Sequence, residues 1–209
     1  FTLWSGFVEN GIRSNPEADV FFNFDTIAGT GGQIWIHPSF EHEVISETDD
    51  KLVYRDANGL IAEVPKDGHS TIPHFTQSSI VTPEDWKREK EKRFSLEHPD
   101  RQIDVASIKE RHPADRDYPL GVNCGSMIGR IRDLLTFEGL AYAVYDYPDM
   151  VEDMVETACQ LVEQSLDQLL PEIDFDYASG WEDIAFKNGP IVSVDFFNSI
   201  VVPRYKRID

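Results

Sequence analysis

The chain has few cysteines, few basic residues and no long apolar run. It contains 2 cysteines, and 19 lysine and arginine residues stand against 38 aspartate and glutamate residues, so its formal net charge is −19. Two cysteines are too few for a disulfide framework. The shortage of clustered basic side chains argues against nucleic acid and anionic membranes as partners, and no apolar segment approaches the roughly 20 residues of a membrane-spanning helix. We therefore expect a cytoplasmic protein.

Several familiar motifs are also missing. The chain has no repeat of fixed period and no Gly-x-Ser-x-Gly turn of a serine hydrolase. Its glycine-rich segment at residues 29–32 does not lead into the helix that a phosphate loop requires. The 6 histidines lack the spacing with cysteine or glutamate that zinc motifs show. We therefore predict no metal site within this chain.

The pattern of apolar residues predicts mixed α/β structure. Three mostly apolar runs have the length of buried strands: residues 18–24, 117–124 and 173–181. Four segments carry helix signals such as caps, early acids or apolar residues at spacings of three and four: residues 82–94, 127–135, 149–169 and 193–201. The order of strands and helices in the second half is typical of parallel α/β structure.

Residues 43–64 depart from this order. Short runs of strand-forming residues flank Asn58-Gly59, a pair that supplies the positive φ angles of a tight turn. We therefore expect an antiparallel β-hairpin here, inserted into the single domain formed by residues 1–209.

Polar side chains follow the first and last of the expected strands, at the end where parallel α/β proteins place their active sites. Asp25 follows the first strand, and its carboxylate could be partly desolvated and donate a proton, or could simply cap the loop. Glu182 and Asp183 follow the last strand, and only one of them can point inward because side chains alternate. That carboxylate could be a general base, a metal ligand or a substrate acceptor; the alternative is a pair of surface acids.

The middle strand supplies candidates for substrate binding. Cys124 lies just before a helix amino terminus, a setting that lowers a thiol pKa, although free cysteines are more often small buried apolar residues. Ser126 is placed to cap that helix. Arg130 and Arg132 lie on the helix, where they could bind an anionic group or be neutralised by neighbouring acids.

The last third of the chain resembles the uroporphyrinogen decarboxylase superfamily. Proteins of that superfamily carry an acid-bearing strand end, a Gly-Pro pair, a short helix and a Pro-x-Tyr-Lys segment in this order. The matching segments are residues 181–190, 196–197 and 202–208, joined upstream by Phe24-Asp25 and by residues 140–150. The resemblance covers most of the chain and is weakest across residues 43–64.

The resemblance implies a TIM barrel, that is, a (β/α)8 barrel of the α/β class. A closed barrel needs about 250 residues, so we expect this chain to hold only part of one. The superfamily contains two chemistries. Uroporphyrinogen decarboxylases of heme biosynthesis remove carboxyl groups from a porphyrinogen without a cofactor, using an aspartate that Asp25 matches. Their relatives are methyltransferases that take a methyl group from a corrinoid and use zinc to activate a thiol such as coenzyme M.

Two departures favour the second chemistry. Decarboxylases have a tyrosine where this chain has Arg132, and a serine where it has Asp183; a chain of charge −19 is also poorly suited to a polyanionic substrate. We therefore expect a methyltransferase with Asp25, Glu182 and Asp183 as catalytic residues. Decarboxylation is the alternative, and a non-catalytic binding module is the second alternative.

The resemblance also bears on cofactors and partners. Zinc and a corrinoid are the implied cofactors of a methyltransferase, with the zinc ligands beyond Asp209, and a decarboxylase would need neither. The expected partner is a small-molecule substrate or a corrinoid protein. A homodimer is left open.

Overall fold

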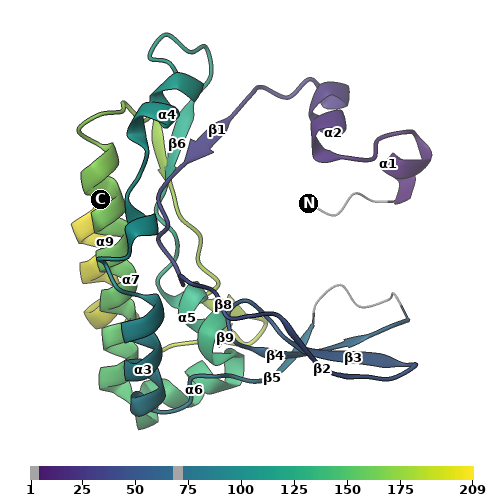
Figure 1. The fold of residues 1–209 in the computed structure, drawn as a ribbon, viewed down its shortest axis with the longest axis vertical. Coiled ribbons are helices and arrows are strands. Elements are labelled where there is room, and N and C mark those ends of the chain that lie inside the picture. Colours follow the sequence, from purple (N-terminus) through teal and green to yellow (C-terminus); the bar gives the residue numbers. More distant parts are fainter. Residues whose placement is uncertain (1–4, 68–72) are drawn as a thin grey trace.

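The computed structural model describes residues 5–67 and 73–209 of the chain. Within these ranges the strands form a three-stranded sheet, a four-stranded sheet and a two-stranded ribbon. Figure 1 shows the four-stranded sheet extending away from the long helix that runs along the opposite side of the molecule. The candidate site depends on the three-stranded sheet.

The three-stranded sheet is parallel, with its middle strand buried. Its strands are β1 (Ala28–Thr30), β6 (Leu120–Asn123) and β7 (Tyr177–Ser179), in the order β1-β6-β7. The ring of Tyr177 lies over Gly121 in β6, where a Cβ atom would come within 2.3 Å of the ring. The Tyr177 hydroxyl donates a hydrogen bond of 3.1 Å to the carbonyl oxygen of Ala28. One side chain therefore spans the sheet from edge to edge.

The four-stranded sheet is antiparallel and confirms the kind of structure expected for residues 43–64. Its strands, in order, are β2 (Glu43–Glu47), β3 (Lys51–Arg55), β4 (Ile61–Pro65) and β5 (His74–Gln77). In the turn between β3 and β4, the Asp56 carboxylate accepts the amide hydrogen bonds of Asn58 and Leu60 at 2.9 and 2.8 Å. Gly59 has a φ of 85°, which glycine adopts without strain. The sequence did not indicate the fourth strand, β5.

Three predicted helices are found close to their expected positions. These are α3 (Pro83–Arg93), α5 (Ile128–Leu135) and α7 (Pro148–Leu169). Helix α3 begins with a capping box: the Thr82 hydroxyl accepts the amide hydrogen bond of Asp85 at 3.2 Å, and the Asp85 carboxylate accepts that of Thr82 at 3.1 Å. Among the described residues, no helix is both long enough and apolar enough to cross a membrane.

Further elements lie between and after these strands and helices. They are η1 (Pro99–Arg101), α4 (Val105–Arg111), α6 (Phe137–Asp146), β8 (Ala185–Phe186), β9 (Gly189–Pro190), α8 (Val194–Phe196), the π-helical turn η2 (Phe197–Val201) and α9 (Val202–Ile208). The helix expected over residues 193–201 is thus present, but it is divided into α8 and η2. Helix α7 packs against α5, α6 and α9.

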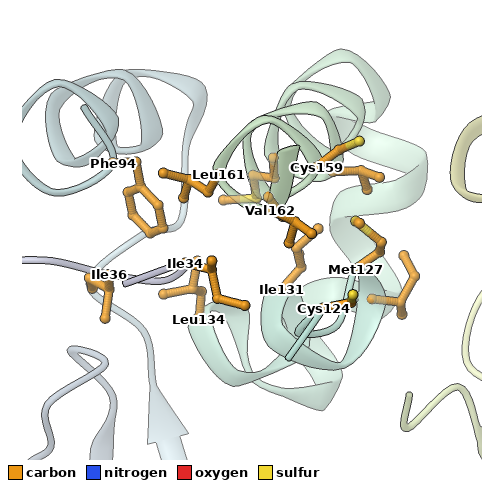
Figure 2. Packing of buried hydrophobic residues seen from close by; sticks show 14 of the residues in the cluster. Ile34, Ile36, Phe94, Cys124, Met127, Ile131, Leu134, Cys159, Leu161 and Val162 are labelled. Carbon is orange, nitrogen blue, oxygen red and sulfur yellow. The ribbon is translucent and has the colours of Figure 1, made fainter. Parts of the chain in front are cut away.

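Apolar side chains from α5, α7 and the segment after β1 form one continuous core (Figure 2). Ile34 and Ile36 come from that segment, Ile131 from α5 and Val162 from α7, and each is at most 9% exposed. Burial of one such side chain stabilises the fold by about 1.5–3 kcal/mol. The core therefore fixes the segment after β1 against the helices that carry the candidate site.

The strand expected over residues 18–24 is wrong. This segment belongs to helix α2 (Asn15–Phe22), which follows the short helix α1 (Ser5–Glu9). The Ser14 hydroxyl accepts the amide hydrogen bond of Glu17 at 3.3 Å, Pro16 occupies the first turn, and Asn23 ends the helix with a φ of 52°. These capping contacts outweigh the apolar run, because a short apolar run fits a helix as well as a strand.

The expected (β/α)8 barrel architecture is also wrong for this structure, because the described strands form separate parallel and antiparallel sheets. Parallel pairing in the described ranges is confined to β1, β6 and β7, and no eightfold repeat of strand and helix runs through them. After β1 the chain enters the separate antiparallel sheet instead of a crossover helix. The fold is mixed α/β, with one parallel and one antiparallel sheet.

Candidate functional site

The carboxyl ends of β6 and β7 bring two predicted site residues together. Main-chain hydrogen bonds continue past the strands: the Cys124 amide donates to the Ser179 carbonyl at 2.7 Å, and the Trp181 amide donates to the Gly125 carbonyl at 2.9 Å. This pairing sets Glu182 beside the start of α5. The Ser126 hydroxyl donates to Glu182 Oε2 at 3.2 Å, so both residues lie at this edge as expected from sequence.

The carboxylate of Glu182 caps helix α5. Oε1 accepts the amide hydrogen bond of Met127 at 2.7 Å, and Oε2 accepts that of Gly129 at 2.8 Å. The amide of Ile128 lies 3.2 Å from both oxygens. A negative charge at this position also interacts favourably with the helix dipole. Both carboxylate oxygens of Glu182 thus accept hydrogen bonds from the start of α5, which are the contacts of a residue that positions this helix. The catalytic role expected for Glu182 stays a prediction.

Tyr205 completes the contacts of Glu182. It lies on α9, and its hydroxyl donates a hydrogen bond to Glu182 Oε1. Burial raises the pKa of Tyr205, and the hydrogen bond to Glu182 acts in the same direction. The phenol therefore stays protonated and remains a donor. The sequence predicted no role for Tyr205, although it belongs to the Pro-x-Tyr-Lys segment that carries the resemblance.

Cys124 does not have the properties expected of a reactive thiol. It is buried, and it lines a cavity of about 280 Å³ beside Tyr205 and β7. Burial raises the pKa of the Cys124 thiol, opposite to the lowering expected from its place before a helix. The thiol is thus kept neutral, which makes it a poor nucleophile and a poor metal ligand.

Arg130 lies between two tryptophans. Its guanidinium carbon is 5.4 Å from the ring centroid of Trp35 and 5.6 Å from that of Trp181. Within residues 5–67 and 73–209, no side-chain or main-chain acceptor binds this guanidinium. The Trp35 indole donates to Asn58 Oδ1 at 3.3 Å, so the turn of the antiparallel sheet orients one of the two rings.

Arg132 and Asp183 are engaged with each other. The Arg132 guanidinium donates to the Asp183 carboxylate, and it also pairs with Asp133 at 2.8 Å. Two carboxylates therefore neutralise Arg132, as the alternative interpretation from sequence allowed. Arg130 is the better candidate of the two for an external anion.

Asp25 lies outside this group. It is exposed and precedes β1, so it is near the amino end of that strand. At about 3.3 Å per residue, it lies on the order of 15 Å along the chain from the carboxyl end of β1. The structure therefore does not bring Asp25 to the edge that carries Ser126 and Glu182. The reason is that residues 18–24 are helical and β1 begins later than expected.

Two arrangements were missed from sequence. One is the pairing of Trp35 with Arg130; the alternation in Ile34-Trp35-Ile36-His37 was a usable signal, because it places Trp35 on the opposite side of this segment from the buried Ile34 and Ile36. The other is a group of three side chains of the kinds that bind metal ions, those of His37, His98 and Asp100, whose nitrogen and oxygen atoms lie within 4.8 Å of one another. The prediction of no metal site rested on spacing in sequence, which does not reveal ligands that meet only in the fold.

The described residues do not fit the zinc site of a thiol-activating methyltransferase. Cys124 and Cys159 are both buried, and burial raises the pKa of both thiols. Neither belongs to a cluster of three metal-ligating side chains in the part of the chain that the structure describes. Neither cysteine in the described ranges is therefore suited to bind a thiol-activating zinc ion.

Comparison with known protein families, with curated proteins and with solved structures finds no match for this chain.

Proposed function

We propose that this protein is an enzyme that binds a small anionic molecule at Arg130 and transfers a methyl group to or from it. The anionic molecule is a thiol that carries a carboxylate or sulfonate. The resemblance to the uroporphyrinogen decarboxylase superfamily implies that a corrinoid would supply the methyl group to that thiol or take it up.

The setting of Arg130 carries the binding part of this proposal. In a chain of net charge −19, most arginine side chains near acids become paired, as Arg132 is. Arg130 instead offers its fork of N–H donors to an external oxyanion. Contact with Trp35 and Trp181 restricts the side chain before binding, so less conformational entropy is lost when a ligand arrives.

The contacts of Glu182 support a role in orientation. Arg130 lies in the first turn of α5, and Glu182 holds the amides of that turn. The Arg130 amide also donates to the Ser126 hydroxyl at 3.1 Å. Glu182 and Ser126 therefore fix the position from which the guanidinium reaches its ligand.

The position of Asp25 favours methyl transfer over decarboxylation. The decarboxylase mechanism needs an aspartate at the reacting pyrroles, and the matching residue here, Asp25, is exposed and precedes β1, away from the carboxyl end of the sheet. We also propose a cytoplasmic location, which the free thiols of Cys124 and Cys159 support because reducing compartments keep thiols unbridged.

Titration of the protein with 2-mercaptoethanesulfonate tests the binding part. Trp181 is 40% exposed, so its fluorescence should report occupancy, and the neutral analogue 2-mercaptoethanol should bind more weakly. Arg130→Gln should weaken binding of the sulfonate about 10- to 100-fold, the loss of a hydrogen bond to a charged group. Lys87→Gln, which removes one exposed positive charge on α3, is the matched control and should leave binding unchanged.

The reaction is tested with methylcobalamin as donor, by mass spectrometry of the methylated thiol. Product that forms with the wild type and is lost with Arg130→Gln supports the proposal. Binding of the thiol without any product would favour a non-catalytic module. Equal binding by wild type and Arg130→Gln, or carbon dioxide release from uroporphyrinogen, would contradict the proposal.

A further inference from the structure

A second group of polar side chains comes from other elements than Ser126 and Glu182: His37 lies between β1 and β2, and His98 and Asp100 lie at the start of η1. His37 Nε2 and Asp100 Oδ2 are 2.6 Å apart, and the rings of His37 and His98 meet edge to face with their centroids 4.6 Å apart. One ligand atom from each of the three residues lies within 4.8 Å of the others. We propose that His37, His98 and Asp100 bind a divalent transition-metal ion, at a site separate from that of Arg130.

A buried arginine, Arg101, holds together the two segments that carry this site. Arg101 is only 2% exposed and has no carboxylate partner among the described residues. Its guanidinium instead donates hydrogen bonds to main-chain carbonyl oxygens on both sides of the site, those of Gln33, Trp35, Arg93 and Ser95. Arg101 thereby fastens the segment that carries His37 to the segment that carries His98 and Asp100.

The main chain adds a further constraint. The His37 amide donates to the Arg93 carbonyl at 2.9 Å, so His37 is fixed at the end of α3. Because Arg101 bonds only to carbonyls, it leaves the Asp100 carboxylate to face the imidazoles. The ligand atoms are thus held near one another without a charged side chain that would compete for them.

The donor set suits a transition metal. Two imidazole nitrogens and one carboxylate oxygen are common ligands of Zn²⁺, with bonds of about 2.0–2.2 Å and a position left open for water or substrate. Such bonds place ligand atoms about 3.4 Å apart in a tetrahedral site. The 2.6 Å between His37 Nε2 and Asp100 Oδ2 is shorter than that value, and all three ligand atoms lie within 4.8 Å of one another. The side chains of His37 and Asp100 are 25% and 63% exposed, so they have room to adjust.

The alternative is a simple ion pair of protonated His37 with Asp100. The metal site and the ion pair differ in their effect on His98. The Nδ1 atom of His98 accepts a hydrogen bond from the Asp100 amide at 3.2 Å. A metal on Nδ1 would take that lone pair, and a metal on Nε2 would leave the proton on Nδ1. Either way the bond from the Asp100 amide is lost, and metal binding also displaces protons from the ligands.

Calorimetry with Zn²⁺ on the full chain, freed of metal by a chelator, tests the site. We expect one strongly bound ion per chain, with release of protons, and Co²⁺ should give visible absorption of a nitrogen-ligated ion. Loss of a residue that only hydrogen-bonds to a metal ligand lowers metal affinity about 10- to 100-fold. His37→Gln and Asp100→Ala each remove a ligand, so each should lower the Zn²⁺ affinity by more than that. The control His42→Gln removes an exposed histidine that stacks on Tyr54 and should bind as the wild type does.

Nuclear magnetic resonance separates the site from weak binding to surface acids. Zn²⁺ should shift the Asp100 amide signal at one equivalent, whereas diffuse binding would shift many acidic positions without saturation. Equal Zn²⁺ affinity in wild type, His37→Gln and Asp100→Ala would overturn the proposal, as would an unmoved Asp100 amide. These measurements involve no thiol, so their outcome is independent of the test on Arg130.

Discussion

Glu182 Oε1 lies 2.7 Å from the amide nitrogen of Met127, so a residue that follows β7 supplies the cap of a helix far from it in sequence. The helix has no side-chain cap from its own N-cap residue, Met127. Glu182 therefore ties the carboxyl end of β7 to the start of α5, and the position of Arg130 depends on this contact.

Replacement of Glu182 by alanine should destabilise the protein. The first amides of α5 would lose their acceptor, and loss of a helix cap costs about 0.5–2 kcal/mol. We expect a lower free energy of unfolding in urea and weaker binding at Arg130. The control Glu91→Ala removes an exposed acid of α3 and should change stability little. Unchanged stability of Glu182→Ala would show that other groups hold α5.

The phenol of Tyr205 should make stability fall at alkaline pH. Burial raises its folded-state pKa, with the hydrogen bond to Glu182 as the second cause. The contribution is therefore present below about pH 10, the ordinary pKa of tyrosine, and is lost as the pH rises above it. Urea unfolding at a series of pH values should show a shallower alkaline loss in Tyr205→Phe. Tyr142→Phe, at a site 62% exposed, should keep the wild-type dependence.

Gly129 should not tolerate a side chain. A Cβ atom there would lie 2.6 Å from the Trp181 ring and 2.7 Å from Ser126 Oγ, so Gly129→Ala should cost about 1–3 kcal/mol. It should also change Trp181 fluorescence, because the ring must move. In Gly139→Ala the nearest atom would be 3.3 Å away, and we expect a change below about 1 kcal/mol. Equal effects of the two substitutions would contradict this packing.

The two thiols should react slowly in the folded protein. Burial raises the pKa of Cys159 to about 11, with the charge of Glu163 as the next cause, and burial also raises the pKa of Cys124. Both are therefore thiols, not thiolates, at neutral pH. A thiol reagent should label neither residue until the protein unfolds, after which both should label. Rapid labelling of one cysteine before unfolding would show that its surroundings are more open than described.

Local signals predicted helix α3 and the turn between β3 and β4 well. Thr82 and Pro83 mark the start of α3, and the Asn58-Gly59 pair marks the turn between β3 and β4. These features depend on residues close together in sequence. The same kind of signal, Ser14 followed by Pro16, marks the start of α2, but the apolar run at residues 18–24 also fits a strand and so hides it.

The candidate site was predicted only in part. Ser126 and Glu182 meet because both follow parallel strands, which the sequence could indicate. The neutralisation of Arg132 by Asp183 depends on which way each side chain points. A shift of one residue in the register of the strand before Asp183 would turn its side chain to the other face. The barrel was wrong for a related reason: strand and helix order does not reveal how many strands pair in one sheet.

The ring of Tyr177 lies across Gly121, and its hydroxyl reaches Ala28 on the far strand. Positions 121 and 177 should therefore covary among related sequences: a larger residue at 121 is compatible only with a smaller one at 177. Strands β1 and β7 are each only 3 residues long. Replacement of Tyr177 by a smaller residue would also remove the hydrogen bond from its hydroxyl to Ala28, which joins these two strands. Substitutions at positions 121 and 177 are thus restricted together. The residue pair at these positions therefore identifies this sheet in a related sequence better than either residue alone.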